Sequence, residues 1–471
     1  MKMEGLAQWA ARDGNRQENP PHLTPLLLTL TLPPSENGLS QTEKSPPPGV
    51  QVGPRRRPFG LQAQFEMNAE SSTLNSIDFP SRPAWIEIDL GRLRKNLRLI
   101  RRELGNAVHL MAVVKDEAYG HGALDLARIA LEEGAWGCGL STLEEALALR
   151  SAGIHAPLVL LGQRQEEELP WCVEHNLIVC VNDAATVRAL ARAAAAQRKR
   201  IPVHLKVNTG MSRYGVRWDE AMDLIEQINA EKALLLQGVM THFAQSDEAD
   251  KTFANLQISR FDEVTNALRQ SGLAMPMQHL CNSGGFLDLP GARRDMVRIG
   301  ILMHGVFPSL VCRRIPGIQP VMSVKARIAA VQNLKPGEVV GYGMRYAAAT
   351  PRRIAVLPIG YGDGFPRVRN EGAVLIRGRR APLIGGVAMD ALTVDITGIP
   401  DAQMWDETVI MGCQGGEEIT VRDLAKLKNS VTYDILTNWR LRLRRKYVND
   451  IVVRSQPAEP VAALAVGQPS K

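Results

Sequence analysis

The chain lacks any uninterrupted apolar run close to the roughly 20 residues that a membrane-spanning helix needs, so we expect no membrane segment. Its six cysteines are scattered and include no C-x-x-C pair, which argues against a zinc site or a disulfide framework. Reduced thiols in a cytoplasmic protein fit this pattern best. We therefore expect no membrane partner, no bound metal and a cytoplasmic location.

Basic charge is not arranged in a way that indicates a nucleic-acid partner. The formal net charge of +7 is spread over 471 residues, and much of it lies in two runs, 54–59 and 438–447. Neither run comes with the alternation of basic and aromatic residues, or the zinc-ligand spacing, that nucleic-acid-binding modules show. We expect no nucleic-acid partner and interpret both runs as solvated surface.

The length of the chain and the changes in composition along it predict four parts of the sequence. A single core stops growing near roughly 250–300 residues, so a chain of 471 residues favours two domains. Pro-rich segments without a sustained period predict that residues 1–82 are a disordered extension. We expect a barrel domain over 83–320, a mostly β domain over 321–455 and a flexible tail over 456–471.

Eight short apolar runs alternate with amphipathic segments such as "ALDLARIALEEG". Runs that are apolar throughout, rather than at alternate positions, are typical of strands buried on both faces. Eight such units predict an α/β fold with a (β/α)8 TIM barrel. The runs are 108–115, 136–140, 157–162, 177–181, 202–208, 235–243, 277–282 and 296–300.

The chain after residue 320 predicts a mostly β C-terminal domain. Strand-like pieces follow one another without long helices and are separated by turns such as "KPGE" and "GDG". The earlier strand-like segment "WIEID", residues 85–89, does not belong to the eight runs. We expect it to complete the β domain.

Polar residues follow the carboxyl ends of five predicted strands, where the loops of a barrel build the active site. Packing alone does not easily place so many polar groups at one barrel mouth. They are Lys115 and Tyr119 after the first run, Arg213 after the fifth, His242 in the sixth, Asn282 and Ser283 at the seventh and Arg298 in the eighth.

Lys115 has two interpretations, a solvated cation at the barrel rim or a reactive amine. Neighbouring cations such as Arg213 and Arg298 would lower its pKa, and a neutral amine is the form that makes a Schiff base with an aldehyde. Small residues at 283–285 and 300–301 lie where barrels commonly bind phosphate. An aldehyde that carries a phosphate suggests pyridoxal 5′-phosphate as the cofactor.

The segment "AVVKDEAYGHG", residues 112–122, resembles the cofactor-lysine signature of alanine racemases. The resemblance continues in order over roughly residues 83–450, through "NTGMSRYG", "THFAQSDE", "HLCNSGG", "VRIGILMHG", "GYGMRYAA", "IGYGDG" and "GGVAMDALTVDIT". It implies a pyridoxal-phosphate enzyme of fold type III that interconverts L-alanine and D-alanine. D-Alanine for peptidoglycan would be its product.

The resemblance also implies a homodimer with shared active sites. Lys115 would hold the cofactor as an aldimine and act as one base, and Tyr342 from the partner subunit would act as the other. Racemisation needs one proton acceptor on each face of the α-carbon, which a lysine and a tyrosine on opposite sides provide. Met389 would come from the partner as well, to contact the substrate carboxylate.

Further roles are implied for the residues of the barrel. Arg213 would bind the cofactor's phenolic oxygen and the substrate carboxylate, and Arg298 would face the pyridine nitrogen. His242 is either a structural histidine or a support for Arg298. The remaining contacts would be Tyr119, Ser283, Gly300 and Ile301 at the phosphate, Asn282 beside them, Lys206 as a carbamylated support for Arg213 and Tyr361 near the substrate entrance.

The chain departs from the family pattern at several positions. Asp116 and Glu117 replace Ala-Asn or Ala-Asp, and would raise the pKa of Lys115 if both faced it. His304 replaces a common tyrosine, Gly386 a common arginine, and Leu441 stands where some relatives have a phosphate-contacting tyrosine.

Three alternatives remain open at this point. A broader racemase acting on serine or lysine would share nearly all of these motifs. A non-catalytic pyridoxal-phosphate carrier would not need the β domain that bears Tyr342 and Met389. A metal-free Schiff-base aldolase would not need the phosphate contacts or Arg298.

Overall fold

The computed structural model describes residues 81–450. The predicted extension, 1–82, lies outside the described residues except for its last two, and the predicted tail, 456–471, lies outside them entirely. Arg82 belongs to the folded part, because its guanidinium pairs with the buried carboxylate of Asp363 at 2.7 Å. Within this range, no helix is both long enough and apolar enough to cross a membrane.

Eight parallel strands form a barrel, in the order β10-β2-β3-β4-β5-β6-β8-β9. Strand β10 pairs with β2, and backbone bonds from Asp295 N to Gln278 O and from Arg298 N to Cys281 O, 3.1 and 2.9 Å long, join β9 to β10. Each predicted run corresponds to one strand, so the predicted barrel is confirmed. The strands are β2 (His109–Val113), β3 (Gly137–Leu140), β4 (Leu158–Leu160), β5 (Ile178–Val181), β6 (Ile201–Asn208), β8 (Leu234–Met240), β9 (Met277–His279) and β10 (Met296–Ile299), with the short β7 (Val216–Arg217) beside β6.

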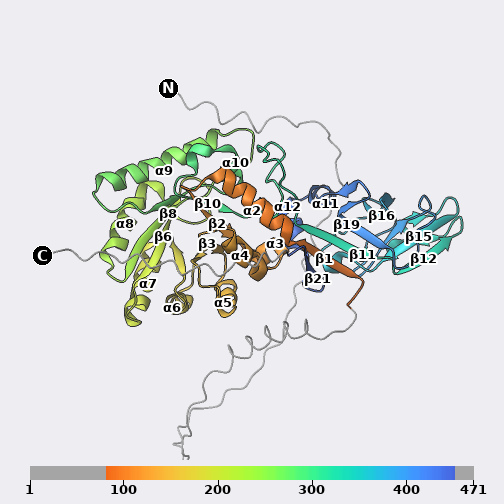
Figure 1. Cartoon of the computed structure of the whole chain (residues 1–471), viewed down its shortest axis with the longest axis horizontal. Helices are drawn as coiled ribbons and strands as arrows, with labels where there is room; N and C mark the ends of the chain where they lie inside the picture. Colours follow the sequence, from red (N-terminus) through yellow and green to blue (C-terminus); the bar gives the residue numbers. More distant parts are fainter. Residues whose placement is uncertain (1–80, 451–471) are drawn as a thin grey trace, which may run out of the picture. The chain divides into compact units, whose positions relative to one another are not determined.

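Helices cover the outside of the barrel, as Figure 1 shows. Side chains cap several of them: Asp89 accepts a hydrogen bond from Arg92 N at the start of α2, and Asp183 accepts one from Thr186 N at the start of α7. The helices are α2 (Leu90–Leu104), α4 (Ala123–Glu132), α5 (Leu143–Ser151), α6 (Leu169–Glu174), α7 (Ala184–Ala196), α8 (Ala221–Ala230), α9 (Thr252–Gln270) and α10 (Ser283–Asp288).

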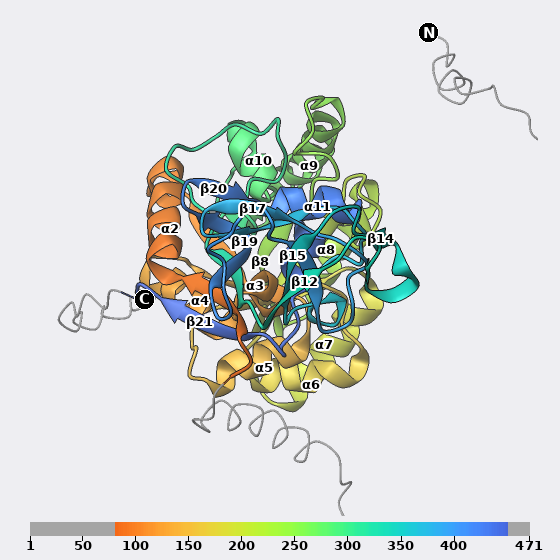
Figure 2. The same ribbon diagram turned by 90° about the vertical axis from the view of Figure 1, so that its right-hand side faces the viewer.

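The β domain stands in front of the barrel in Figure 2 and contains two main sheets. One follows the order β17-β16-β19-β11-β1-β21, and the other β12-β15-β18. The domain also has two helices, α11 (Val421–Lys428) and α12 (Thr432–Thr437). Its strands are β11 (Met322–Arg327), β12 (Ala330–Leu334), β13 (Val339–Val340), β14 (Tyr346–Ala347), β15 (Arg352–Leu357), β16 (Ala373–Ile376), β17 (Arg379–Pro382), β18 (Leu392–Asp395), β19 (Glu407–Gln414), β20 (Glu417–Ile419) and β21 (Arg444–Val448).

Strand β1 (Ala84–Asp89) lies inside the first of these sheets. Ile86 is opposite Val324 in the antiparallel pair with β11 and opposite Arg445 in the parallel pair with β21. The early strand-like segment therefore completes the β domain, as expected. The domain limits at 320 and 455 stay predictions.

Candidate active site

The carboxyl ends of the barrel strands open into a cavity of about 620 Å³, which we call the mouth. The structure brings nine of the eleven predicted site residues together in its lining, whereas Tyr342 and Met389 lie elsewhere. The nine are Lys115, Tyr119, Arg213, His242, Asn282, Ser283, Arg298, Gly300 and Ile301.

Lys115 begins α3 (Lys115–Gly120), which is not a regular helix. The four residues from Asp116 to Tyr119 have φ values between 50° and 56°, the left-handed region. Glu145 supports this turn, since its Oε1 accepts a hydrogen bond from Asp116 N at 2.5 Å. Its Oε2 accepts one from Ser141 N at 2.8 Å, so a single carboxylate joins two loops of the mouth.

The two acidic residues after Lys115 are both exposed and have different environments. Glu117 Oε2 accepts a hydrogen bond from Ala123 N at 3.2 Å, at the start of α4. The charge of Asp116 raises the pKa of the Lys115 amine. Burial and the charge of Arg213, which are the main effects, lower this pKa. The net result is a lowered pKa for Lys115, so the acidic neighbours do not outweigh burial and the charge of Arg213.

Small residues form the wall of the mouth after β9 and β10. A Cβ atom at Gly300 would lie 2.4 Å from the Tyr119 hydroxyl, so only glycine lets the Tyr119 side chain lie this close to the backbone. Ser283 Oγ accepts a hydrogen bond from Gly300 N at 3.3 Å. Asn282 has a structural role, because its Oδ1 accepts from Gly285 N at 2.9 Å and caps α10.

Arg298 is only 3% exposed and has five acceptors around it, one of which is His279 Nδ1 at 3.2 Å from its Nη1. It donates to the carbonyl oxygens of Thr241, His279 and Leu280 at 2.7 to 2.9 Å, and its Nη2 lies 3.1 Å from His242 Nδ1. Burial lowers its pKa to about 10, so it still carries its charge at neutral pH. A guanidinium only donates, so His242 Nδ1 accepts and the proton of this neutral ring lies on Nε2.

Lys206 lies on β6, is 6% exposed and faces the same mouth. Burial is the main cause that lowers its pKa to about 8. Its Nζ donates to Leu161 O at 3.2 Å and lies 5.1 Å from the centre of the Tyr214 ring. Arg213 is exposed, and its guanidinium has no hydrogen bond or ion pair within residues 81–450. It is therefore available for an anionic ligand.

Tyr342 and Met389 lie on the surface of the β domain. Tyr342 is 80% exposed and Met389 is 53% exposed. Tyr342 lines a separate hollow together with Tyr361, Arg367 and Gly386. Within one chain, neither residue lines the mouth.

Sequence reasoning missed Tyr433, which reaches the mouth from α12. Its ring centre lies 6.1 Å from that of Tyr119. Leu441, at the position where the resemblance expects a tyrosine, is exposed. No local pattern marks Tyr433, whereas Glu145 could have been found from the capping-box spacing "TLEE" before an apolar run.

The fold and the mouth place the chain in the class of α/β-barrel proteins that have a lysine in the cavity at the carboxyl ends of the strands. Comparison with protein families gives a match to the alanine racemase N-terminal domain over residues 88–308 and to the C-terminal domain over 321–447. The chain is 37% identical to the alanine racemase of Halothermothrix orenii, over 79% of this chain and 98% of that protein. The chain therefore belongs to the alanine racemase family.

Two solved structures are similar over nearly their whole length. Alanine racemase from Clostridium difficile has a TM-score of 0.75 and 29% identity, covering 79% of this chain and 97% of that one. Histidine racemase from Leuconostoc mesenteroides has a TM-score of 0.73 and 29% identity, covering 79% and 99%. The fold thus serves proteins named for different amino acids.

Proposed function

We propose that the chain is a pyridoxal-phosphate-dependent racemase that interconverts L-alanine and D-alanine. The observation that carries this proposal is the mouth, where a lysine with a lowered pKa lies with Arg213, Arg298 and a wall of small residues. Its membership of the alanine racemase family supports the same substrate.

The residues of the mouth fit the cofactor. Lys115 provides the amine for its aldehyde, and the part of the mouth lined by Tyr119, Ser283 and Gly300 suits a phosphate. Arg298 remains protonated and so leaves a pyridine nitrogen without a proton. Pyridoxal phosphate, when bound, supplies electron withdrawal that acidifies the α-carbon of the amino acid.

Two bases then move the proton. Lys115 accepts or returns the proton on one face of the α-carbon. Its lowered pKa favours the neutral form of the amine, which is the form that accepts the proton. The partner's Tyr342 does the same on the other face, and the partner's Met389 meets the substrate carboxylate beside Arg213. Both residues are exposed and neither lines the mouth of its own chain, which supports a homodimer with shared sites.

Substrate range is tested by offering the purified protein L-alanine, L-serine, L-lysine and L-histidine separately. Histidine is included because one similar structure is a histidine racemase. Alanine should give the highest kcat/KM, and a clear preference for another amino acid would overturn the alanine assignment. A non-catalytic carrier would be favoured by two results together. The protein would turn over none of these amino acids, and it would show the visible absorbance of a bound cofactor that disappears in Lys115→Ala.

We also propose a cytoplasmic protein that supplies D-alanine for peptidoglycan. All six cysteines are free thiols, five of them buried, which suits a reducing compartment.

A further inference from the structure

Two completely buried histidines, His204 on β6 and His279 at the end of β9, lie outside the lining of the mouth. Neither has a part in the proton transfer proposed for Lys115 and Tyr342. A buried polar group without a partner costs about 1–3 kcal/mol, so the contacts of the two rings decide what they contribute.

Arg298, His279 and His204 form one continuous set of contacts, which we call the histidine row. Arg298 Nη1 lies 3.2 Å from His279 Nδ1, and His279 Nε2 lies 3.1 Å from His204 Nδ1. The two rings meet edge to face, with centres 4.9 Å apart and planes inclined by 69°. The histidine row therefore runs from β10 through β9 to β6.

The contacts determine which nitrogen of His279 carries the proton. Burial, reinforced by the charges of His204 and Arg298, lowers the pKa of His279 well below its usual value, so the ring is neutral and has a single N–H. A guanidinium only donates, so His279 Nδ1 accepts from Arg298 and the proton lies on Nε2. This N–H donates to His204 Nδ1.

His204 continues the same order of donors and acceptors. Burial lowers its pKa to about 4, so this ring is also neutral. Because its Nδ1 accepts from His279, its own proton lies on Nε2. The Gln237 side chain raises the pKa of His204, as an acceptor near that proton would, although Nε2 has no hydrogen bond of normal geometry among residues 81–450.

Gly238 makes the contact between the two histidines possible. Strand β8 lies between β6 and β9, and Gly238 on β8 is opposite His204, directly after a shift in the pairing register. A Cβ atom at Gly238 would lie 2.7 to 2.9 Å from three atoms of the His204 ring. Only glycine therefore leaves room for this ring to reach across β8 to His279.

We propose that His204 is a positioning residue for Arg298. By accepting from His279 Nε2, His204 keeps the proton away from His279 Nδ1, and this nitrogen remains an acceptor for the guanidinium. In the other tautomer two N–H groups would oppose each other, and Arg298 would lose one of its five acceptors. The effect on catalysis rests on the proposed function, in which Arg298 faces the pyridine nitrogen of the cofactor.

Nitrogen-15 spectra of the histidine-labelled holoenzyme test the tautomers directly, since they distinguish protonated from unprotonated ring nitrogens. The chain has nine histidines, and their signals are assigned by loss in single variants. At neutral pH we expect His279 and His204 to carry the proton on Nε2. A proton on His279 Nδ1 would overturn the proposal.

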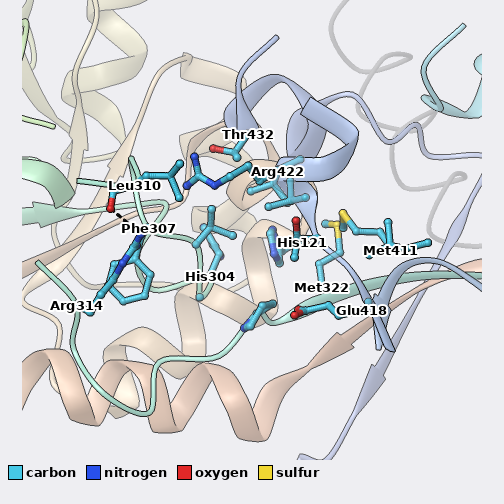
Figure 3. Close-up of a pocket in the computed structure, with 18 residues that line it drawn as sticks. His121, His304, Phe307, Leu310, Arg314, Met322, Met411, Glu418, Arg422 and Thr432 are labelled. Atoms are coloured by element: carbon cyan, nitrogen blue, oxygen red, sulfur yellow. Dashed lines mark hydrogen bonds between the residues drawn. The ribbon is translucent and has the colours of Figure 1, made fainter. Parts of the chain in front are cut away.

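His121, which Figure 3 shows beside His304, is an internal reference with the opposite arrangement. Its Nδ1 lies 2.9 Å from the carbonyl oxygens of both Ala118 and Tyr119. Carbonyl oxygens only accept, so the same spectrum should show the proton of His121 on Nδ1.

Two substitutions of His204 separate positioning from space filling. His204→Leu removes the acceptor, so part of the His279 proton should move to Nδ1. Loss of about one hydrogen bond should then lower kcat for alanine about tenfold. KM should change by less than about threefold, because the substrate carboxylate is assigned to Arg213 and Met389. His204→Asn keeps an oxygen acceptor near the position of Nδ1 and should retain the wild-type tautomer and most of kcat.

Equal losses of kcat in His204→Leu and His204→Asn, with the His279 tautomer unchanged, would show that the ring only fills space and would overturn the proposal. An unchanged tautomer and kcat in His204→Leu would do the same. The wild-type spectrum decides the proton positions even if the leucine variant fails to fold. A wild type that does not racemise alanine would defeat the proposed function, whereas the spectrum would still decide whether His204 orders the proton of His279.

Discussion

Glu145 accepts a hydrogen bond from the backbone N–H of Asp116 at 2.5 Å, although the two residues are 29 positions apart. The same carboxylate caps α5 in a capping box with Thr142. A left-handed conformation costs roughly 1–2 kcal/mol per residue, and four successive residues adopt it after Lys115. The geometry of the reactive amine therefore depends on a carboxylate from the next βα loop.

Glu145→Ala should destabilise the chain and slow turnover. It leaves the N–H groups of Asp116 and Ser141 without their acceptor, so we expect the free energy of unfolding to fall by about 2–3 kcal/mol. Chemical denaturation and kcat measure the two effects. Glu144→Ala is the control, because Glu144 is exposed in the same helical turn. Equal losses in both variants would contradict a special role for Glu145.

Asp116→Asn should lower the pKa of Lys115 further. The charge of Asp116 favours the protonated amine, so its removal favours the neutral one. The rate at which apoenzyme takes up pyridoxal phosphate covalently should then reach its plateau at a lower pH than in the wild type. Glu117→Gln should leave the profile in place, because that carboxylate faces α4 instead. An upward shift in Asp116→Asn would refute this explanation.

Lys206→Met should stabilise the chain below about pH 8. The pKa of Lys206 falls from 10.5 to about 8 on folding, so between these values the unfolded chain binds more protons and stability rises with pH. Below pH 8 the wild type bears the cost of a buried cation, of the order of 1–3 kcal/mol, which methionine avoids. Urea denaturation in buffer free of carbon dioxide should show a difference between the two proteins that shrinks toward pH 10.5.

Added bicarbonate extends the Lys206 measurement. A neutral amine can form a carbamate, so bicarbonate should stabilise the wild type at pH 8 and leave Lys206→Met unchanged. A difference between the proteins that does not vary with pH would show that Lys206 does not titrate as described.

Mixed dimers should recover activity from two inactive variants. Lys115→Ala lacks one base and Tyr342→Phe lacks the other, so each homodimer should lose nearly all turnover. After subunit exchange, a heterodimer has one site with both bases and one with neither, and about a quarter of wild-type activity should return at equal mixing. Differently tagged subunits verify the exchange. Exchange without any recovery would exclude a site shared between subunits.

The sequence predicts the barrel well because each strand is short, continuous and buried on both faces. The eight runs and the outlying segment 85–89 all correspond to strands, and the ends of the runs locate nine residues of the mouth. These predictions depend on local apolar pattern and on the rule that barrel loops build the site.

Other parts of the site depend on contacts between distant segments. The left-handed turn of Asp116–Tyr119 could not be predicted from the sequence, because residues of these types usually avoid positive φ. Glu145 and the neighbouring loops hold the turn in this conformation. Tyr433 comes from the β domain, far along the chain from the strands that it faces. Three of the acceptors around Arg298 are carbonyl oxygens of Thr241, His279 and Leu280, which no sequence pattern reveals.

The position of β1 has a consequence for how the protein is made. Its hydrogen-bonded neighbours, β11 and β21, are synthesised much later, and Asp89 accepts a hydrogen bond from Asn449, 360 positions away. On the ribosome, the barrel strands can pair as they emerge, whereas the sheet around β1 must wait for the last described strand. Pairing over such a separation is slow. One edge of β1 should therefore stay unpaired during translation, as a target for chaperones and proteases, even after β11 has been made and until β21 follows.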